Sequence, residues 1–95
     1  MHLEIITPET KIFVGEAQSV QLPGLDGSFQ VLNNHAPIIS GLAAGTVKIE
    51  LESAFEADEK TSKLIQVDNN PSTIRVTIKG GVMELLNNKV IVLAE

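Results

Sequence analysis

Apolar and polar residues alternate along most of this 95-residue chain. Two segments show the pattern over their whole length, residues 46–52 and 72–79. Their apolar members are Val47, Ile49, Leu51, Ile74, Val76 and Ile78. A period of two is typical of a β-strand with one buried face, because successive side chains point to opposite sides. We therefore expect these six side chains to share one core.

Turn-forming residues interrupt the alternating runs about every 8 to 12 residues, which is typical of an all-β sandwich or barrel. They are Thr7-Pro8, Pro23-Gly24, Asp26-Gly27, Asn33-Asn34, Asn69-Asn70-Pro71 and Asn87-Asn88. Such residues tolerate positive φ or preset a bend. No amphipathic helix of normal length is visible. The sequence predicts an all-β fold, a two-sheet antiparallel β-sandwich of about ten short strands.

The segment from Ser53 to Ser72 departs from this alternation. Its first part, Ser53–Lys63, is polar and acidic, and we expect it to form a hairpin extension outside the core. Residues 53–56 carry the capping-box pattern, which would allow one helical turn, although helices this short are marginal in isolation.

The last strand is apolar on both faces, from Val90 to Ala94. The same excess occurs at Leu3, Ile5, Ile6, Met83, Leu85 and Leu86. A sandwich of this size has one interior, so some of these side chains must point outward. We expect another protein to cover that outward apolar surface. The alternative is that loops or a sheet edge of the chain itself cover it.

Length and composition limit the class of protein. Residues 1–95 suffice for one domain with a single modest core. The net charge is −5, the basic residues are scattered, and Trp and Tyr are absent, so we expect no nucleic-acid partner. The absence of cysteine excludes disulfides and thiolate metal sites. We see neither a signal peptide nor an apolar run of about 20 residues, so we expect a soluble, unexported chain.

The residues that could carry chemistry do not form an enzyme motif. His35 is the first candidate for acid-base catalysis, but Ser28 and Ser40 lie in no nucleophile motif and His2 is the only other histidine. We interpret His35 as a residue that fixes the shape of the 33–37 turn by hydrogen bonding. The glycines match no phosphate-binding pattern, and we expect no cofactor, no metal and no catalytic activity.

Two segments resemble one known family. Pro23–Gly45, PGLDGSFQVLNNHAPIISGLAAG, resembles the signature of the epsilon subunit of F-type ATP synthases. Lys79–Glu95, KGGVMELLNNKVIVLAE, looks like the Gly-Gly hairpin and final strand that end the β-sandwich domain of that family. The segment Ser53–Ser72 is longer than the short connection that we expect at this place in the family.

The resemblance implies a non-catalytic rotor subunit of the central stalk. Such a subunit docks beside the gamma subunit and rests on the polar loops of the c-ring, so that proton-driven rotation reaches the catalytic subunits as torque. Mapped onto this chain, the loops Gly24–Ser28 and Asn33–Gly41 would face the ring and the foot of gamma. The interface candidates are Asp26, Ser28, Asn34, His35 and Ser40. The resemblance also implies a peripheral membrane location on the cytoplasmic face of a bacterial inner membrane, through the complex.

Members of this family usually continue into a C-terminal helical hairpin that can inhibit ATP hydrolysis and in some members binds ATP. This sequence stops at Glu95, so we expect neither the inhibitory arm nor ATP binding. The alternative function is a free-standing β-sandwich that binds a small ligand around Asp26, Asn34 and His35. The lack of Trp and Tyr argues against sugar stacking, and the two-faced last strand favours a protein partner.

Overall fold

The computed structural model describes residues 1–95 and contains nine strands and no helix. The strands are β1 (His2–Ile6), β2 (Lys11–Gly24), β3 (Gly27–Leu32), β4 (Ile38–Leu42), β5 (Gly45–Leu51), β6 (Ile65–Val67), β7 (Thr73–Ile78), β8 (Gly81–Leu86) and β9 (Lys89–Ala94). The all-β prediction is confirmed. The capping-box residues 53–56 form no helical turn.

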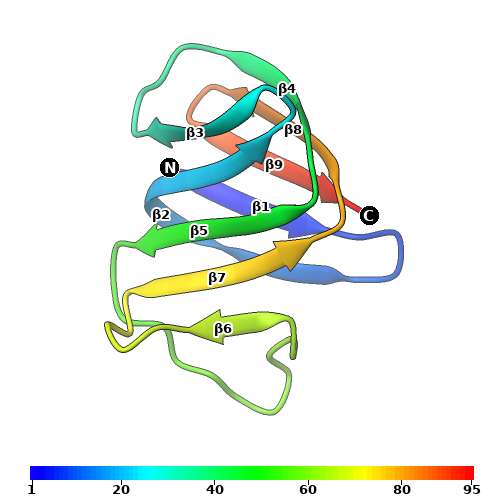
Figure 1. The fold of residues 1–95 in the computed structure, drawn as a ribbon. Coiled ribbons are helices and arrows are strands. Elements are labelled where there is room, and N and C mark those ends of the chain that lie inside the picture. The colour runs from blue at the N-terminus through cyan, green and yellow to red at the C-terminus, as the bar shows by residue number, and fades with distance from the viewer.

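The strands form a sandwich of two layers in which one strand is shared (Figure 1). Residues 11–16 of β2 pair with β1, and residues 17–24 pair with β3 and β5. The first layer therefore has the order β3-β2-β5-β7-β6, and the second has the order β2-β1-β9-β8-β4. The register of β2 skips Gln18 at the point where the strand passes between layers. Such a bulge bends a strand and increases its twist.

All strand pairings are antiparallel except one. Strand β1 runs parallel to β9, with Leu3 opposite Val90 and Ile5 opposite Val92. The sequence predicted antiparallel sheets because its turn signals indicate hairpins. No hairpin connects the first strand with the last, so no local signal sets their relative direction. The parallel pair brings the two ends of the fold together in the second layer.

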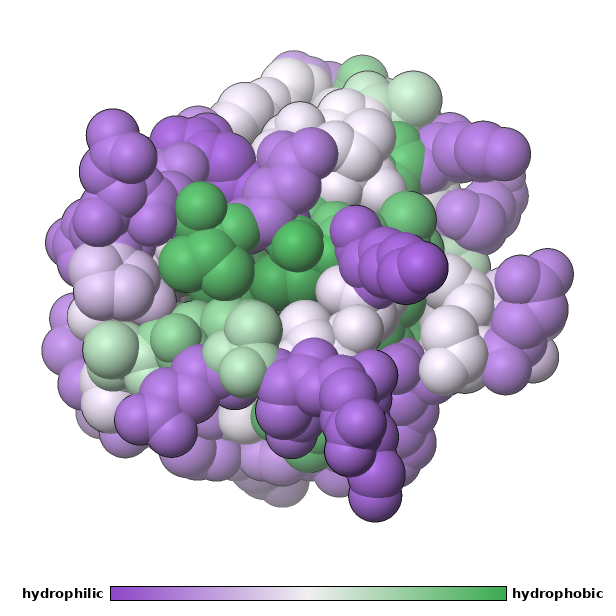
Figure 2. Space-filling view, turned by 90° about the horizontal axis from the view of Figure 1, so that it is seen from below, coloured by the Kyte–Doolittle hydropathy of each residue, from purple (hydrophilic) through white to green (hydrophobic).

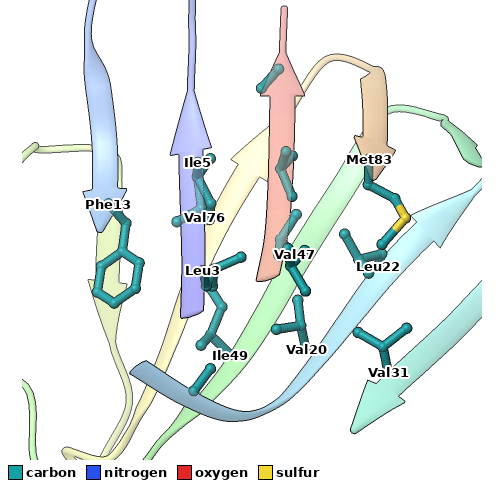
Figure 3. Close-up of a cluster of buried hydrophobic side chains, with 14 of the residues drawn as sticks. Leu3, Ile5, Phe13, Val20, Leu22, Val31, Val47, Ile49, Val76 and Met83 are labelled. Atoms are coloured by element: carbon teal, nitrogen blue, oxygen red, sulfur yellow. The ribbon is translucent and has the colours of Figure 1, made fainter. Parts of the chain in front are cut away.

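The core lies between the layers and contains 21 buried hydrophobic residues. The six residues of the alternating segments are all among them, each 8% exposed or less, which confirms the prediction. Val47 lies directly opposite Val76, and Ile49 lies opposite Ile74. Figure 3 shows side chains from both layers meeting in this interior. Burying a side chain of this kind contributes about 1.5 to 3 kcal/mol.

An aromatic contact closes the end of the sandwich near β6. Strand β6 is the lowest strand in Figure 1. Phe55 packs against the core, and its N–H donates to the carbonyl oxygen of Pro71 at 2.8 Å. The ring of Phe55 approaches the ring of Phe13. The Phe13 ring fits at this place because Gly15 has no side chain: a Cβ on Gly15 would lie only 2.7 Å from the ring. The expectation that Ser53–Lys63 lies wholly outside the core is therefore wrong for Phe55.

The rest of that segment is polar and mostly exposed, as expected, and it leads into the short edge strand β6. A hollow of about 260 Å³ opens beside it, lined by Phe13, Val14, Phe55 and Ile65 among others. In the view from below, apolar surface is framed by polar side chains (Figure 2). Ile12 and Phe13 are buried at this end of the core, while Phe55 and Ile65, which pack against the core, are only partly buried.

Candidate functional site

The two outer faces of the sandwich differ in character. The first layer exposes mainly polar side chains, among them Gln21, Gln30, Glu50, Gln66 and Thr77. Its exposed large hydrophobic residues are Leu32 at 54% and Val67 at 45%, which lie apart on the outermost strands β3 and β6. The second layer exposes apolar side chains over β4, β8 and β9. They are Ile39 at 73%, Leu93 at 54%, Leu86 at 49% and Val82 at 45%, with Ile91 half-buried between them. Large contiguous apolar surfaces on a small domain usually mark interaction sites.

The strand register places these side chains on three adjacent strands, around Glu84 of β8. Val82 lies opposite Leu93 in the β8–β9 pair, and Ile39 lies opposite Glu84 in the β4–β8 pair. Leu25, in the β2–β3 turn, extends the surface. Its side chain lies close over Gly41 of β4, where a Cβ would be only 2.6 Å from it. We refer to the surface formed by Leu25, Ile39, Val82, Leu86, Ile91 and Leu93 as the apolar face.

The sequence predicted only part of the apolar face. The two-faced pattern of residues 90–94 and the excess at Leu86 indicated it, and Leu93 and Leu86 are indeed exposed. Leu25, Ile39 and Val82 were missed. The doublet Ile38-Ile39 was a signal of the same kind, since adjacent residues of a strand point to opposite faces.

An ionic cluster borders the apolar face on β1. The carboxylate of Glu4 lies 3.0 Å from Nε2 of His2, 3.5 Å from Nζ of Lys89 and 3.7 Å from Nζ of Lys11. The hydrogen bond with His2, aided by the two lysine charges, lowers the pKa of Glu4 below its ordinary value. Nδ1 of His2 also lies 3.1 Å from Glu16 on β2. These contacts link three adjacent strands on the outer surface.

Three of the five interface candidates surround one hollow. Asp26 and Ser28 of the β2–β3 hairpin and Ser40 of β4 line a space of about 500 Å³. Asp26 is exposed and makes no hydrogen bond through its side chain. The Ser28 hydroxyl accepts from the Gln21 amide at 3.0 Å, and the Ser40 hydroxyl donates to the Gly41 carbonyl oxygen at 3.0 Å.

Asn34 and His35 lie beyond the other end of β3, in the loop that leads to β4. The N–H of Asn34, which has φ 63°, donates to Oδ1 of Asn88 at 2.9 Å. Nδ1 of the His35 ring donates to the carbonyl oxygen of Ala36 at 2.7 Å. The backbone N–H of His35 donates to the carbonyl oxygen of Leu32 at 3.2 Å. These bonds agree with the interpretation of His35 as a residue that shapes its turn.

The structure therefore does not gather all five candidates in one site. Asp26 and the pair Asn34 and His35 are separated by the length of β3, so they cannot surround one small ligand as the alternative function requires. Both groups nevertheless lie along the upper side of the molecule, at the two ends of β3 (Figure 1). A large partner could touch both groups at once.

Other kinds of site find no support in the geometry. No group of three or more His, Asp or Glu side chains is arranged to hold a metal ion. Every buried side-chain nitrogen or oxygen has a hydrogen-bond partner. None of the structure's elements is a helix long and apolar enough to cross a membrane. The surface features that stand out are the apolar face and the two loops.

Comparison with known proteins agrees with the fold. Residues 1–62 match the family model described as "ATP synthase, Delta/Epsilon chain, beta-sandwich domain". An ATP synthase epsilon chain of Chlorobium limicola is 36% identical over 98% of this chain and 86% of the relative. One from Salinibacter ruber is 35% identical, but this chain spans only 56% of that relative's length.

Among solved structures, a chain in the central stalk and c-ring of the Tetrahymena thermophila mitochondrial ATP synthase has the same fold. Its TM-score is 0.67 at 17% sequence identity, over 99% of this chain and 62% of the other. At this level of identity the likeness supports the fold alone.

Proposed function

The chain belongs to the ATP synthase delta/epsilon family, and we propose that it is a non-catalytic rotor subunit of the central stalk of an F-type ATP synthase. In this role it links the gamma subunit to the c-ring, so that proton-driven rotation of the ring is coupled to ATP synthesis elsewhere in the complex. It would be held at the cytoplasmic face of a bacterial inner membrane by its partners.

We propose that the apolar face docks against gamma. The observation that carries this assignment is the contrast between the two outer faces, mainly polar on the first layer and apolar over β4, β8 and β9 on the second. Removing the side chains of Ile39, Val82 and Leu93 from water contributes free energy in proportion to the area buried. The exposed hydrophobic residues of the first layer, Leu32 and Val67, lie on strands at its opposite edges and form no such cluster. The ionic cluster around Glu4 would lie at the polar rim of this contact.

We propose that the upper side of the molecule meets the c-ring. Asp26, Ser28 and Ser40 lie at one end of β3, and Asn34 and His35 lie at the other. All but Ser40 are exposed, and they are carried on turns anchored to the sandwich, where binding residues commonly lie. The Asn34 loop is tied to the β8–β9 turn through Asn88, which supports a fixed rather than adaptable contact.

A rotor joint must pass force between two partners without deforming. Strand β2 is shared by the two layers and so connects them. The β1–β9 pair joins the first strand of the chain to the last. A close-packed core of this kind resists deformation and transmits strain. Force applied at the upper loops would therefore reach the apolar face through the sandwich itself.

Co-expression with the gamma subunit of the same organism tests this proposal. The two proteins should co-elute in size-exclusion chromatography as a stable complex. Separate elution under the same conditions, with the chain folded by circular dichroism, would contradict the proposed rotor function.

A further inference from the structure

One charged side chain lies inside the apolar face. Glu84 stands opposite Ile39 in the pairing of β4 with β8 and opposite Ile91 in the pairing of β8 with β9. Val82 and Leu86, two residues to either side on β8, point the same way and are exposed. Glu84 is thus bordered by apolar side chains along its own strand and on both neighbouring strands.

The same carboxylate lines a mainly apolar hollow. A space of about 370 Å³ lies over β4 and β8, and Glu84 is the only charged residue among those that line it. The others are Pro37, Ile38, Ile39, Leu85 and Leu86. A partner side chain that entered this hollow would lie within reach of Glu84.

Glu84 has no cationic partner within the chain. The ion pairs of the structure use the carboxylates of Glu4, Glu16 and Asp68. The nearest lysine along the register is Lys89, opposite Leu86, and its ammonium group lies 3.5 Å from Glu4. In the free protein Glu84 is exposed, so water solvates it and no partner is needed.

Docking of a partner changes the solvation of Glu84. A protein that covers the apolar face removes water from Glu84 together with its neighbours. An unpaired carboxylate in an apolar interface carries a large desolvation penalty, and an opposite charge with good hydrogen-bond geometry can offset it. Surrounding apolar contacts exclude water and strengthen such a pair.

We propose that the partner that docks on the apolar face presents a lysine or arginine that pairs with Glu84. This inference rests on the proposed docking of gamma. Glu84 then determines specificity: it rejects an entirely apolar surface and fixes the register in which the correct partner binds.

The test measures the dissociation constant for gamma with wild-type chain and with Glu84→Gln, Glu84→Leu and Glu84→Lys. The same three substitutions at Glu50, which is exposed on the outer face of the first layer, serve as matched controls. Both positions are exposed, so all variants should fold, which thermal denaturation checks.

We expect Glu84→Gln and Glu84→Leu to weaken binding by about 30-fold or more, because the cation of the partner is left buried without its counter-charge. Glu84→Lys should weaken it further, and the Glu50 variants should bind like wild type. The leucine variant is decisive, since a face that requires only apolar contact would bind it more tightly.

Equal or tighter binding of Glu84→Gln or Glu84→Leu, while wild type binds gamma, overturns the proposed ion pair and leaves the rotor function intact. Failure of the wild-type chain and of the Glu50 variants to bind gamma overturns the proposed function first, and the inference with it.

Discussion

The aromatic rings of Phe13 and Phe55 meet at the end of the sandwich near β6, with centroids 6.3 Å apart and planes inclined at 43°. Phe13 comes from the shared strand β2, and Phe55 comes from the irregular segment between β5 and β6. The contact therefore fastens an otherwise polar loop to the core. Aromatic pairs in tilted geometry add to the free energy gained from burying their area.

Replacement of Phe55 tests the importance of this contact. Phe55→Ala should lower the free energy of unfolding by about 2 kcal/mol, less than a fully buried phenylalanine because the ring is only partly covered. Urea denaturation measures the difference. Glu59→Ala, at an exposed position of the same segment, is the control and should stay within about 0.5 kcal/mol of wild type.

Val76 tests the pairing of β5 with β7. It lies opposite both Val47 and Ile65 and is fully buried. Val76→Asp would place an unpaired charge between the layers, at a cost of several kcal/mol against a total stability of about 5 to 10 kcal/mol, so the domain should unfold. The neighbouring Thr77→Asp faces solvent and should fold. A normal thermal transition for Val76→Asp would refute the strand assignment.

The ionic cluster predicts a pH dependence of stability. The folded state lowers the pKa of Glu4, so the carboxylate stabilises the fold above its unfolded pKa of about 4.3. This stabilisation decreases as the pH falls below that value and is lost once the pH has fallen through the lowered pKa.

The measurement compares wild type with Glu4→Gln by urea denaturation between about pH 7 and about pH 3. Wild type should be the more stable at neutral pH, and the difference should shrink in the acid range. Glu50→Gln, at a carboxylate without an ion pair, should show no such trend. A difference between Glu4→Gln and wild type that is constant across this range would contradict the electrostatic explanation.

The proposed ring contact predicts a defect in coupling rather than in folding. Exposed polar contacts are individually weak, so Asp26→Ala or His35→Ala should each change association by only about 1 kcal/mol. Asp26→Lys combined with Ser28→Arg should instead introduce repulsion or a clash at one end of β3.

That double variant should fold and bind gamma, but membranes that carry it should retain less of the catalytic head and synthesise less ATP. Thr46→Lys with Thr77→Arg, on the outer face of the first layer, supplies the control. Wild-type retention and synthesis in the Asp26 and Ser28 variant would mean that this turn points away from the ring.

The sequence predicted those parts of the fold that depend on local patterns. Strict alternation in residues 46–52 and 72–79 identified the core of the first layer, because a period of two leaves only one way to bury Val47 and Ile74. Turn residues such as Asn87 and Asn88 have the positive φ values that their types favour, 51° and 60°.

Features set by long-range pairing could not be predicted in this way. No local signal indicates that β1 lies parallel to β9, or that β4 lies beside β8 and adds Ile39 to the apolar face. Phe55 looked like part of a solvated loop because its neighbours are charged. Only its proximity to Phe13 in three dimensions reveals its role.

The most direct test of the proposed docking compares two double variants with equal chemistry on opposite faces. Val82 and Leu93 are cross-strand neighbours on the outer surface of β8 and β9, and Thr46 and Thr77 are cross-strand neighbours on the outer surface of β5 and β7. The measurement is the dissociation constant for gamma of Val82→Asp with Leu93→Asp and of Thr46→Asp with Thr77→Asp. We expect the first to weaken binding by more than about 100-fold and the second to bind like wild type. Wild-type affinity in the Val82 and Leu93 variant, or loss of binding in the Thr46 and Thr77 variant, would contradict the assignment of the apolar face to gamma.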